Sequence, residues 1–348
     1  MLLVATVAAL GCSNWLMPHG TGLSGRTTDL GGSKLLAFEM RTLPRGSSVL
    51  GSKLLPGGVT SYGYLGVVPT VVSKQVAPMV TAGINEQGLT CDMQTLITTQ
   101  MPPKSNSSSD LFVELFCQWA LGGFNDTDGV RAALLDPQRV HVYGSHLESG
   151  VNGQHYSLRD RHGRSLVVEW VGGSQQVYQD LDDHGVTGWG IMTNEPEYPW
   201  MVRMVQHFEW KQGLARPSTS VPGAFYPDER FLRLHLLRKG LPPPTDAREA
   251  LMHAVHVLNS VTVPPGLQMG TDSGPGEGSG DHTLWGVIYD HTNATLYFRH
   301  ATNQNMQRVR LSDLPLDKGS PVMQLPMGAQ NGLAYVGEAA ASFRKAKQ

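Results

Sequence analysis

The sequence has few charged residues and very few cysteines. Charged side chains make up 16% of the 348 residues, and 27 Lys and Arg nearly balance 29 Asp and Glu, giving a formal net charge of −2. A near-neutral chain lacks the clustered basic charge on which nucleic-acid binding depends, so no nucleic-acid partner is expected. The three cysteines cannot form a disulfide framework, because at least one of them stays unpaired.

The sequence also lacks an apolar run long enough for a stable membrane span. The uncharged apolar run MLLVATVAALG at 1–11 is too short, because a transmembrane helix needs about 20 residues. It resembles the apolar part of a secretory signal peptide, and Ala9 and Gly11 are the small residues that signal peptidase prefers before a cut at Cys12. Two alternatives stay open: a retained, buried first strand, and a lipoprotein signal that would leave a lipid on Cys12.

The apolar run at 1–11 indicates where the mature protein is expected to be located. We predict that residues 1–11 are a signal or pro-segment, removed by signal peptidase or by autocatalysis. The mature protein is then secreted, periplasmic or in the secretory or lysosomal lumen. Three Asn-x-Ser/Thr sequons are glycosylation candidates that fit this location, although such sequons also arise by chance. They lie at Asn106, Asn125 and Asn293.

The 40 glycines and 22 prolines favour strands joined by many loops over a helical bundle. Alternating patterns predict strands at 35–40, 79–84, 155–160, 165–170, 283–289 and 295–298. Two hairpins are predicted, one at 83–89 with the turn NEQG and one that joins 155–160 to 165–170 through the turn RHGR. One helical pattern begins at Leu111 and ends at Gly122-Gly123. Further helices are predicted at 127–135, 199–213, 228–239 and 245–259, and Thr245 is the candidate N-cap of the last. Blocks of strands and blocks of helices in turn indicate an α+β fold. No linker divides the chain, so 12–348 is predicted to be one domain.

Several familiar catalytic and binding motifs are missing. There is no G-x-S-x-G nucleophile elbow and no H-E-x-x-H zinc motif. His253 and His256 are three residues apart on a predicted helix, but no third metal ligand is evident, so two ordinary helix histidines are the favoured interpretation. The glycine-rich loop 270–280 lacks the Lys and Ser/Thr of a phosphate-binding loop. No metal and no organic cofactor is therefore expected.

Cys12 has a specific chemistry if it becomes the first residue of the chain. A free α-amine titrates near about 8 and a free thiol near about 8.5, so the amine of Cys12 can accept the proton of its own thiol without a separate histidine. A nearby guanidinium would stabilise the thiolate, and a carboxylate would orient the amine. Arg26 and Asp29 supply both groups a short distance along the chain.

Blocks along nearly the whole chain resemble the choloylglycine hydrolase family, which includes bile salt hydrolases and penicillin V acylases. The first is CSNW at 12–15 followed by GRTTD at 25–29, similar to the Cys and Arg-x-x-Asp near the start of family members. The later blocks, in chain order, are GINEQGL at 83–89, TNEP at 193–196, PG at 222–223 with ERFLR at 229–233, and TLW at 283–285 with IYD at 288–290.

The resemblance implies an N-terminal nucleophile (Ntn) hydrolase fold, in which two packed antiparallel sheets lie between helices in four layers, αββα. It also implies hydrolysis of a linear amide through a thioester. By match to the family motifs, Cys12 is the nucleophile, Arg26 contacts its thiolate and Asp29 contacts its amine. Asn194 would donate to the oxyanion, and Arg230 would support the site from the first turn of its helix.

The sequence departs from the family at one position near the expected substrate. Bile salt hydrolases carry Asn there and penicillin acylases often carry Tyr, whereas this chain has Thr95, preceded by Gln94. The backbone N–H of Thr95 can still line an oxyanion hole, because any non-proline residue supplies one. Trp15 and Met17 are predicted to line an apolar acyl pocket.

The substrate class implied by the resemblance is an N-acyl amide, similar to a conjugated bile salt, penicillin V or an N-acyl amino acid. One alternative is a lipid amidase that acts on N-acylethanolamines or ceramides. A second alternative is a non-catalytic binding protein or lipoprotein on the same scaffold. Because family members are often tetramers, a homo-oligomer is the expected assembly.

Overall fold

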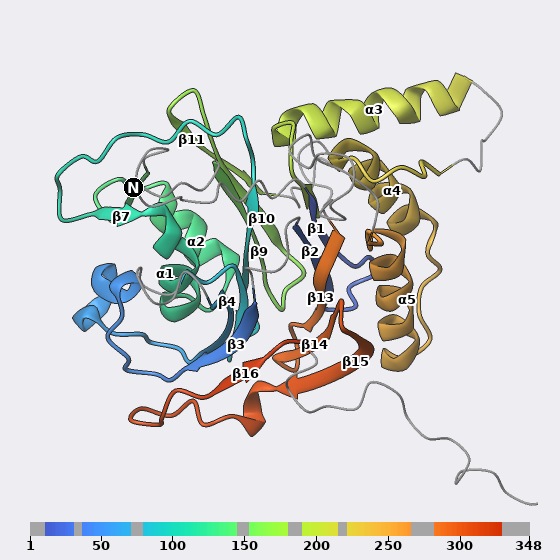
Figure 1. Ribbon diagram of the computed structural model, residues 1–348. Helices are drawn as coiled ribbons and strands as arrows, with labels where there is room; N and C mark the ends of the chain where they lie inside the picture. Colours follow the sequence, from blue (N-terminus) through green and yellow to red (C-terminus); the bar gives the residue numbers. More distant parts are fainter. Residues whose placement is uncertain are drawn as a thin grey trace, which may run out of the picture.

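Two antiparallel sheets form the centre of the fold, and helices cover their outer faces (Figure 1). The computed structural model describes residues 11–30, 37–70, 79–144, 153–179, 190–214, 221–265 and 282–328. The larger sheet contains, in spatial order, β11 (Ser174–Gln179), β10 (Ser165–Val171), β9 (Gln154–Arg159), β6 (Thr90–Thr95), β5 (Ala82–Asn85), β4 (Tyr64–Pro69), β3 (Phe38–Leu43) and β16 (Gln324–Pro326). The smaller sheet contains β12 (Ile191–Thr193), β1 (Gly11–Leu16), β2 (Leu23–Leu30), β13 (His282–Asp290), β14 (Thr295–His300) and β15 (Asn303–Arg310).

The helices form the two outer layers. α1 (Phe116–Gly123) and α2 (Thr127–Leu134) lie on the larger sheet, while α3 (Tyr198–Leu214), α4 (Pro227–Gly240) and α5 (Ala247–Ser260) lie on the side of the smaller sheet (Figure 1). A small parallel pair, β7 (Asp110–Phe112) with β8 (His141–Tyr143), flanks α1. Short 3-10 turns cover Leu50–Leu54, Pro56–Gly58, Val113–Leu115 and Leu311–Asp313.

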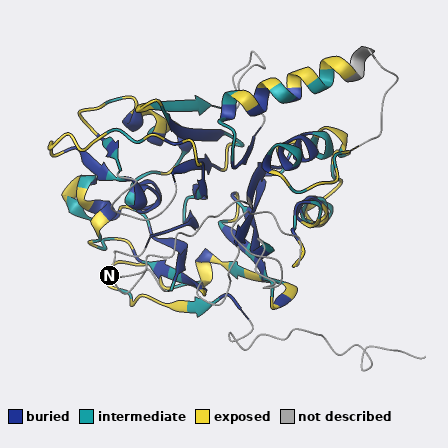
Figure 2. Ribbon diagram, turned by 45° about the horizontal axis from the view of Figure 1, so that its top comes forward, coloured by how far each residue is buried: buried dark blue, intermediate teal, exposed yellow. Residues whose placement is uncertain are grey.

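Three apolar clusters hold these four layers together, and Figure 2 shows the strands as the most buried part of the molecule. Phe116 of α1 belongs to the cluster under the larger sheet, and Phe231 of α4 to the cluster under the smaller one. Phe38 and Trp285 lie between the sheets with their ring centres 5.7 Å apart. The predicted α+β class, with two antiparallel sheets packed between helices, is confirmed.

The two predicted hairpins are present, β5–β6 and β9–β10. Each has a glycine in its turn with positive φ, +81° at Gly88 and +74° at Gly163, which L-amino acids with side chains rarely adopt. A Cβ at position 88 would also lie 2.0 Å from the carbonyl oxygen of His291. The turn residues visible in the sequence therefore specify these hairpins.

Several element boundaries differ from the prediction. Leu111 belongs to strand β7, and α1 begins only at Phe116. The N-cap of α5 is Asp246, whose carboxylate accepts the N–H of Glu249 at 2.8 Å, whereas the predicted cap Thr245 bonds the Glu249 side chain. β15 and β16, which follow the last predicted strand, were not predicted. Their residues are largely exposed and polar and carry no clear alternation. Residues 1–10 and the loop 270–280 lie outside the described residues.

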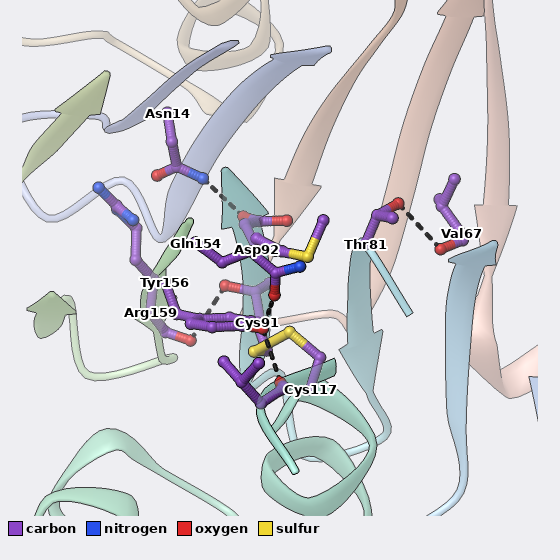
Figure 3. The surroundings of a disulfide bond; sticks show 12 residues. Asn14, Val67, Thr81, Cys91, Asp92, Cys117, Gln154, Tyr156 and Arg159 are labelled. Atoms are coloured by element: carbon purple, nitrogen blue, oxygen red, sulfur yellow. Dashed lines mark hydrogen bonds between the residues drawn. A yellow bond between two sulfur atoms is a disulfide. The ribbon is translucent and has the colours of Figure 1, made fainter. Parts of the chain in front are cut away.

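A disulfide joins β6 to α1, between Cys91 and Cys117, with the Cα atoms 5.4 Å apart (Figure 3). Both cysteines are fully buried where the larger sheet packs against α1. Cys12 is the one remaining cysteine of the chain, and its thiol is free.

Removal of this disulfide is expected to lower the free energy of unfolding. The bond closes a loop with a sequence separation of 26, for which a cost of about 3 kcal/mol is typical. Urea unfolding of the Cys91→Ala/Cys117→Ala double variant measures the loss, with Cys12→Ala as the control that removes a thiol outside any disulfide. Equal unfolding midpoints for the double variant and the wild type would contradict this expectation.

Candidate active site

The alternation of β1 sends its side chains to the two faces of the smaller sheet. The amide nitrogen of Asn14 donates to Asp92 Oδ2 on β6 at 2.6 Å, so Asn14 faces the larger sheet (Figure 3). Cys12, two residues before Asn14 on the same strand, faces the same way. Ser13 faces the helices, because its hydroxyl accepts a bond from Arg230 of α4 at 2.6 Å. Cys12 is only 3% exposed, so its thiol lies between the layers.

The backbone of Cys12 is held on both sides. Its N–H donates to Oδ1 of Asn194 at 2.5 Å, and its carbonyl oxygen accepts from Nη1 of Arg230 at 2.5 Å. The backbone N–H of Asp29, on the neighbouring strand β2, donates to the sulfur. The nitrogen, carbonyl and sulfur of this one residue therefore each have a buried polar partner.

Asn194 and Arg230 hold each other as well as Cys12. Nη2 of Arg230 donates to Oδ1 of Asn194 at 3.2 Å, and Nδ2 of Asn194 donates to the carbonyl oxygen of Thr95 at 2.8 Å. Both side chains are fully buried. Asn194 directly follows β12, and α4 begins with Pro227, whose carbonyl oxygen accepts the Thr193 hydroxyl at 2.9 Å. This bond ties the turn that carries Asn194 to the helix that carries Arg230.

Asp29 lies on the helix side of the smaller sheet. Its carboxylate accepts from the hydroxyl of Thr283 at 2.5 Å and of Thr27 at 3.4 Å, and it lies 3.9 Å from Nη1 of Arg230. The acceptor at the nitrogen of Cys12 is the Asn194 amide. The five residues predicted to be catalytic, Cys12, Arg26, Asp29, Asn194 and Arg230, are thus brought together, while their chemical roles stay predictions.

Arg26 is fixed from the opposite sheet. Its guanidinium donates to the carbonyl oxygens of Thr81 and Met93 and lies 3.4 Å from the buried carboxylate of Asp92. It also lies over the ring of Trp285, 5.1 Å from the centroid. Asp92 was not predicted as a site residue. A carboxylate inside the buried strand TCDMQT was the available signal, since buried charges are almost always paired.

The charges around Cys12 act on its thiol in opposite directions. Burial raises the pKa of the Cys12 thiol, because the thiolate is poorly solvated between the sheets. The positive charge of Arg26 is the largest effect that lowers this pKa, and Arg230 adds to it, while the carboxylate of Asp29 raises it. Arg26 and Arg230 are therefore the side chains that counteract burial and favour the thiolate form of Cys12.

Substitution of Arg26 by Gln is expected to raise the thiol pKa further, because it removes the largest stabilising charge. A raised pKa leaves less thiolate at a given pH, so the rise of Cys12 alkylation by iodoacetamide should move to higher pH. Cys12 is the free thiol of the chain, so the reaction reports on this residue alone. Arg45→Gln, which removes a half-exposed arginine elsewhere, is the control. An unchanged pH dependence in Arg26→Gln would contradict the assigned role.

The residues predicted to line the substrate site are placed differently from one another. Thr95 and Gln94 end strand β6 and are both buried, and Thr95 contacts Asn194 directly. Trp15 and Met17 lie instead in the apolar cluster beneath α3, α4 and α5. The alternation of β1 places Trp15 on the face opposite to Cys12. This position corrects the prediction that Trp15 lines the acyl pocket, and it gives Met17 no support either.

The described residues contain no group of three His, Cys, Asp or Glu side chains arranged to hold a metal ion. In the same part of the chain, no helix is long and apolar enough to cross a membrane. The sequon residues Asn106, Asn125 and Asn293 are all exposed, so their side chains are accessible, and their glycosylation stays a prediction.

Known proteins that are similar to this chain point to one family. Residues 14–324 match the family model described as "Linear amide C-N hydrolases, choloylglycine hydrolase family". A penicillin V acylase of Pectobacterium atrosepticum is 23% identical over 288 residues, covering 77% of this chain and 71% of that protein. A bile salt hydrolase/transferase of Clostridium perfringens is 25% identical over 205 residues, covering 53% of this chain and 60% of that protein.

Solved structures show the same fold. Penicillin V acylase from Agrobacterium tumefaciens superposes with a TM-score of 0.72 at 21% identity, covering 97% of this chain and 98% of its own. A single-residue variant of conjugated bile acid hydrolase from Clostridium perfringens gives a TM-score of 0.71 at 19% identity, covering 90% of this chain and 97% of its own. These likenesses show the Ntn-hydrolase arrangement of sheets and helices. Because the family model matches residues 14–324, most of this chain, the chain belongs to the choloylglycine hydrolase family of linear amide C–N hydrolases.

Proposed function

We propose that this protein hydrolyses an N-acyl amide with the thiol of Cys12 as nucleophile and the α-amine of Cys12 as base. One observation carries the proposal: the chain's single free thiol is buried where Asn194, Arg230 and Asp29 contact the same residue. A cysteine kept only for packing needs no such set of partners, because a buried free cysteine behaves as a small apolar side chain.

The proposed reaction starts with attack of Sγ on the amide carbonyl carbon, while the α-amine takes the thiol proton. Oδ1 of Asn194 orients that amine, as it orients the nitrogen of Cys12 in the structure. The second N–H of the Asn194 amide and the backbone N–H of Thr95 stabilise the oxyanion. The C–N bond then breaks, and the amine product leaves with the transferred proton. The acyl group stays on Sγ of Cys12 as a thioester. Water then cleaves the thioester, releases the carboxylic acid and regenerates the thiol.

The names of two relatives suggest the kind of substrate. Proteins similar to this chain are a penicillin V acylase and a bile salt hydrolase/transferase. We infer an N-acyl amide substrate similar to penicillin V, a conjugated bile salt or an N-acyl amino acid. A lipid amidase that acts on N-acylethanolamines or ceramides is the alternative within the same chemistry.

A panel of amides separates these substrate classes. The mature protein is incubated with penicillin V, a glycine-conjugated bile salt, an N-acyl amino acid, an N-acylethanolamine and a ceramide, and the released amine is measured. Hydrolysis of one of the first three supports the proposal. Preference for the last two favours the lipid amidase, and binding without release of any amine favours a non-catalytic binding protein.

The proposed base exists only if the chain before Cys12 is removed, so we propose cleavage after Gly11 and export of the protein. A buried disulfide supports this location, because disulfides persist mainly in secreted, periplasmic and lumenal proteins. Retention of residues 1–11 in a fully active enzyme would overturn this part of the proposal.

A further inference from the structure

A group of buried polar side chains lies beside the candidate oxyanion site and takes no part in the reaction described above. Gln94 on β6 is paired in register with His155 on β9, so both side chains lie on the same face of the larger sheet. This is also the face of Asp92, which contacts the smaller sheet through Asn14 and Tyr289. Gln94 and His155 are each 1% exposed.

Polar atoms in this group lack a hydrogen-bond partner among the described residues. They are both amide atoms of Gln94, Nε2 of His155 and Oε2 of Glu195. Buried polar atoms in native proteins are nearly always paired, and leaving one unpaired is costly. Several unpaired atoms on one row of residues indicate a place where another molecule supplies the partners.

Glu195 belongs to the same group. It follows Asn194 in the turn after β12, and it is partly exposed, so this side of the group is close to solvent. Burial raises the pKa of the Glu195 carboxyl, and the nearby charges of His155 and Arg230 oppose that rise. The preceding residue Asn194 bonds both Arg230 and the carbonyl oxygen of Thr95, so Glu195 lies between the group and the surroundings of Cys12.

The orientation of His155 is fixed from its other side. Its Nδ1 lies 2.9 Å from the carboxylate of Glu169, which also accepts the backbone N–H of Tyr198 at the start of α3. The Glu169 carboxylate can only accept, so Nδ1 carries the proton of this bond, and Nε2 is the ring nitrogen that is left for the group. The group then offers two oxygen acceptors, Gln94 Oε1 and Glu195 Oε2, with the Gln94 amide nitrogen as a donor and His155 Nε2 as a further polar atom.

We propose that Gln94, His155 and Glu195 form a polar subsite that binds a hydroxyl group of the amide substrate. A hydroxyl both donates and accepts, which matches this set of atoms. The inference rests on the proposed function and adds to it a substrate with a hydroxyl on its acyl part or on its amine part.

The test uses pairs of amides that differ by one hydroxyl. In one pair the hydroxyl is on the acyl chain, and in the other it is on the amine, as in an N-acylethanolamine compared with the N-propylamide of the same acid. The wild type is expected to prefer one hydroxylated member. Gln94→Met, which keeps the side-chain length, should raise the KM for that member by about 10-fold to 100-fold and leave kcat and the other member little changed.

Gln154→Met is the matched control. Gln154 precedes His155 on β9, but its side chain lies on the opposite face, where Oε1 accepts the Tyr156 hydroxyl at 2.6 Å (Figure 3). It should leave the preference for the hydroxylated member intact. Glu195→Ala, in a partly exposed turn, is a second subsite variant if Gln94→Met does not fold.

The outcomes separate the subsite from the proposed function. If the wild type hydrolyses both members of each pair equally, or if Gln94→Met and Glu195→Ala change both members equally, the subsite is overturned while the hydrolase stands. If no amide is hydrolysed, the proposed function fails. The subsite is then judged by calorimetry of the same amides with Cys12→Ala, where equal affinity with and without the hydroxyl overturns it.

Discussion

Replacement of Cys12 by Ala is expected to abolish amide hydrolysis, and replacement by Ser to reduce kcat by on the order of 10³-fold or more. The alanine variant has no atom to attack the carbonyl. The serine variant keeps an oxygen at nearly the same place, but a hydroxyl is a much poorer nucleophile than a thiolate. The measurement is the rate of amine release under single-turnover and steady-state conditions.

Two controls make this result specific to the chemistry. Thermal unfolding of both variants should stay close to the wild type, because Cys12 is in no disulfide. The variants should also fail to react with iodoacetamide, since the two other cysteines are joined to each other. Wild-type turnover by Cys12→Ala would mean that another group is the nucleophile.

Asn194→Asp is expected to lower kcat/KM by about 10²-fold to 10³-fold, the usual cost of losing one oxyanion donor. The structure gives the amide two functions: Oδ1 accepts from the Cys12 nitrogen and from Arg230, while Nδ2 is a donor beside Thr95. Aspartate keeps the acceptor and loses the donor, so it separates the two functions.

Comparison with Asn194→Ala completes this test. If stabilisation of the oxyanion dominates, the aspartate and alanine variants lose similar amounts of kcat/KM. If orientation of the Cys12 amine dominates, the aspartate variant stays near the wild type and only the alanine variant is impaired, which would contradict the assigned role. Asn125→Ala, the same change at an exposed position, is the control.

Local signals in the sequence were sufficient for much of the fold. Glycines in the turns of β5–β6 and β9–β10 predicted both hairpins, and α2 and α4 were predicted to within a residue or two. β15 was missed because its residues are mostly exposed and polar, which removes the alternation that identifies a half-buried strand. The start of α1 was misplaced because the apolar residues from Leu111 onwards suit a buried strand as well as a helix face.

The site was harder to predict from the sequence than the fold, because it depends on contacts between distant segments. Cys12, Asn194 and Arg230 are joined by hydrogen bonds across 182 and 218 positions of the chain, and only the family motifs brought them together in the sequence analysis. The pairing of Gln94 with His155 depends on a strand register that no local pattern specifies. The error at Trp15 was avoidable, since an alternating strand sends its side chain away from Cys12.

The most direct test of a Cys12 nucleophile with a free amine is the mass of the mature protein before and during turnover. We expect a chain that begins at an unmodified Cys12. After an acid quench during turnover, we expect a gain equal to one acyl group, located on the N-terminal peptide and removed by hydroxylamine. An active enzyme that retains residues before Cys12, or whose acyl group is on another residue, would contradict this mechanism.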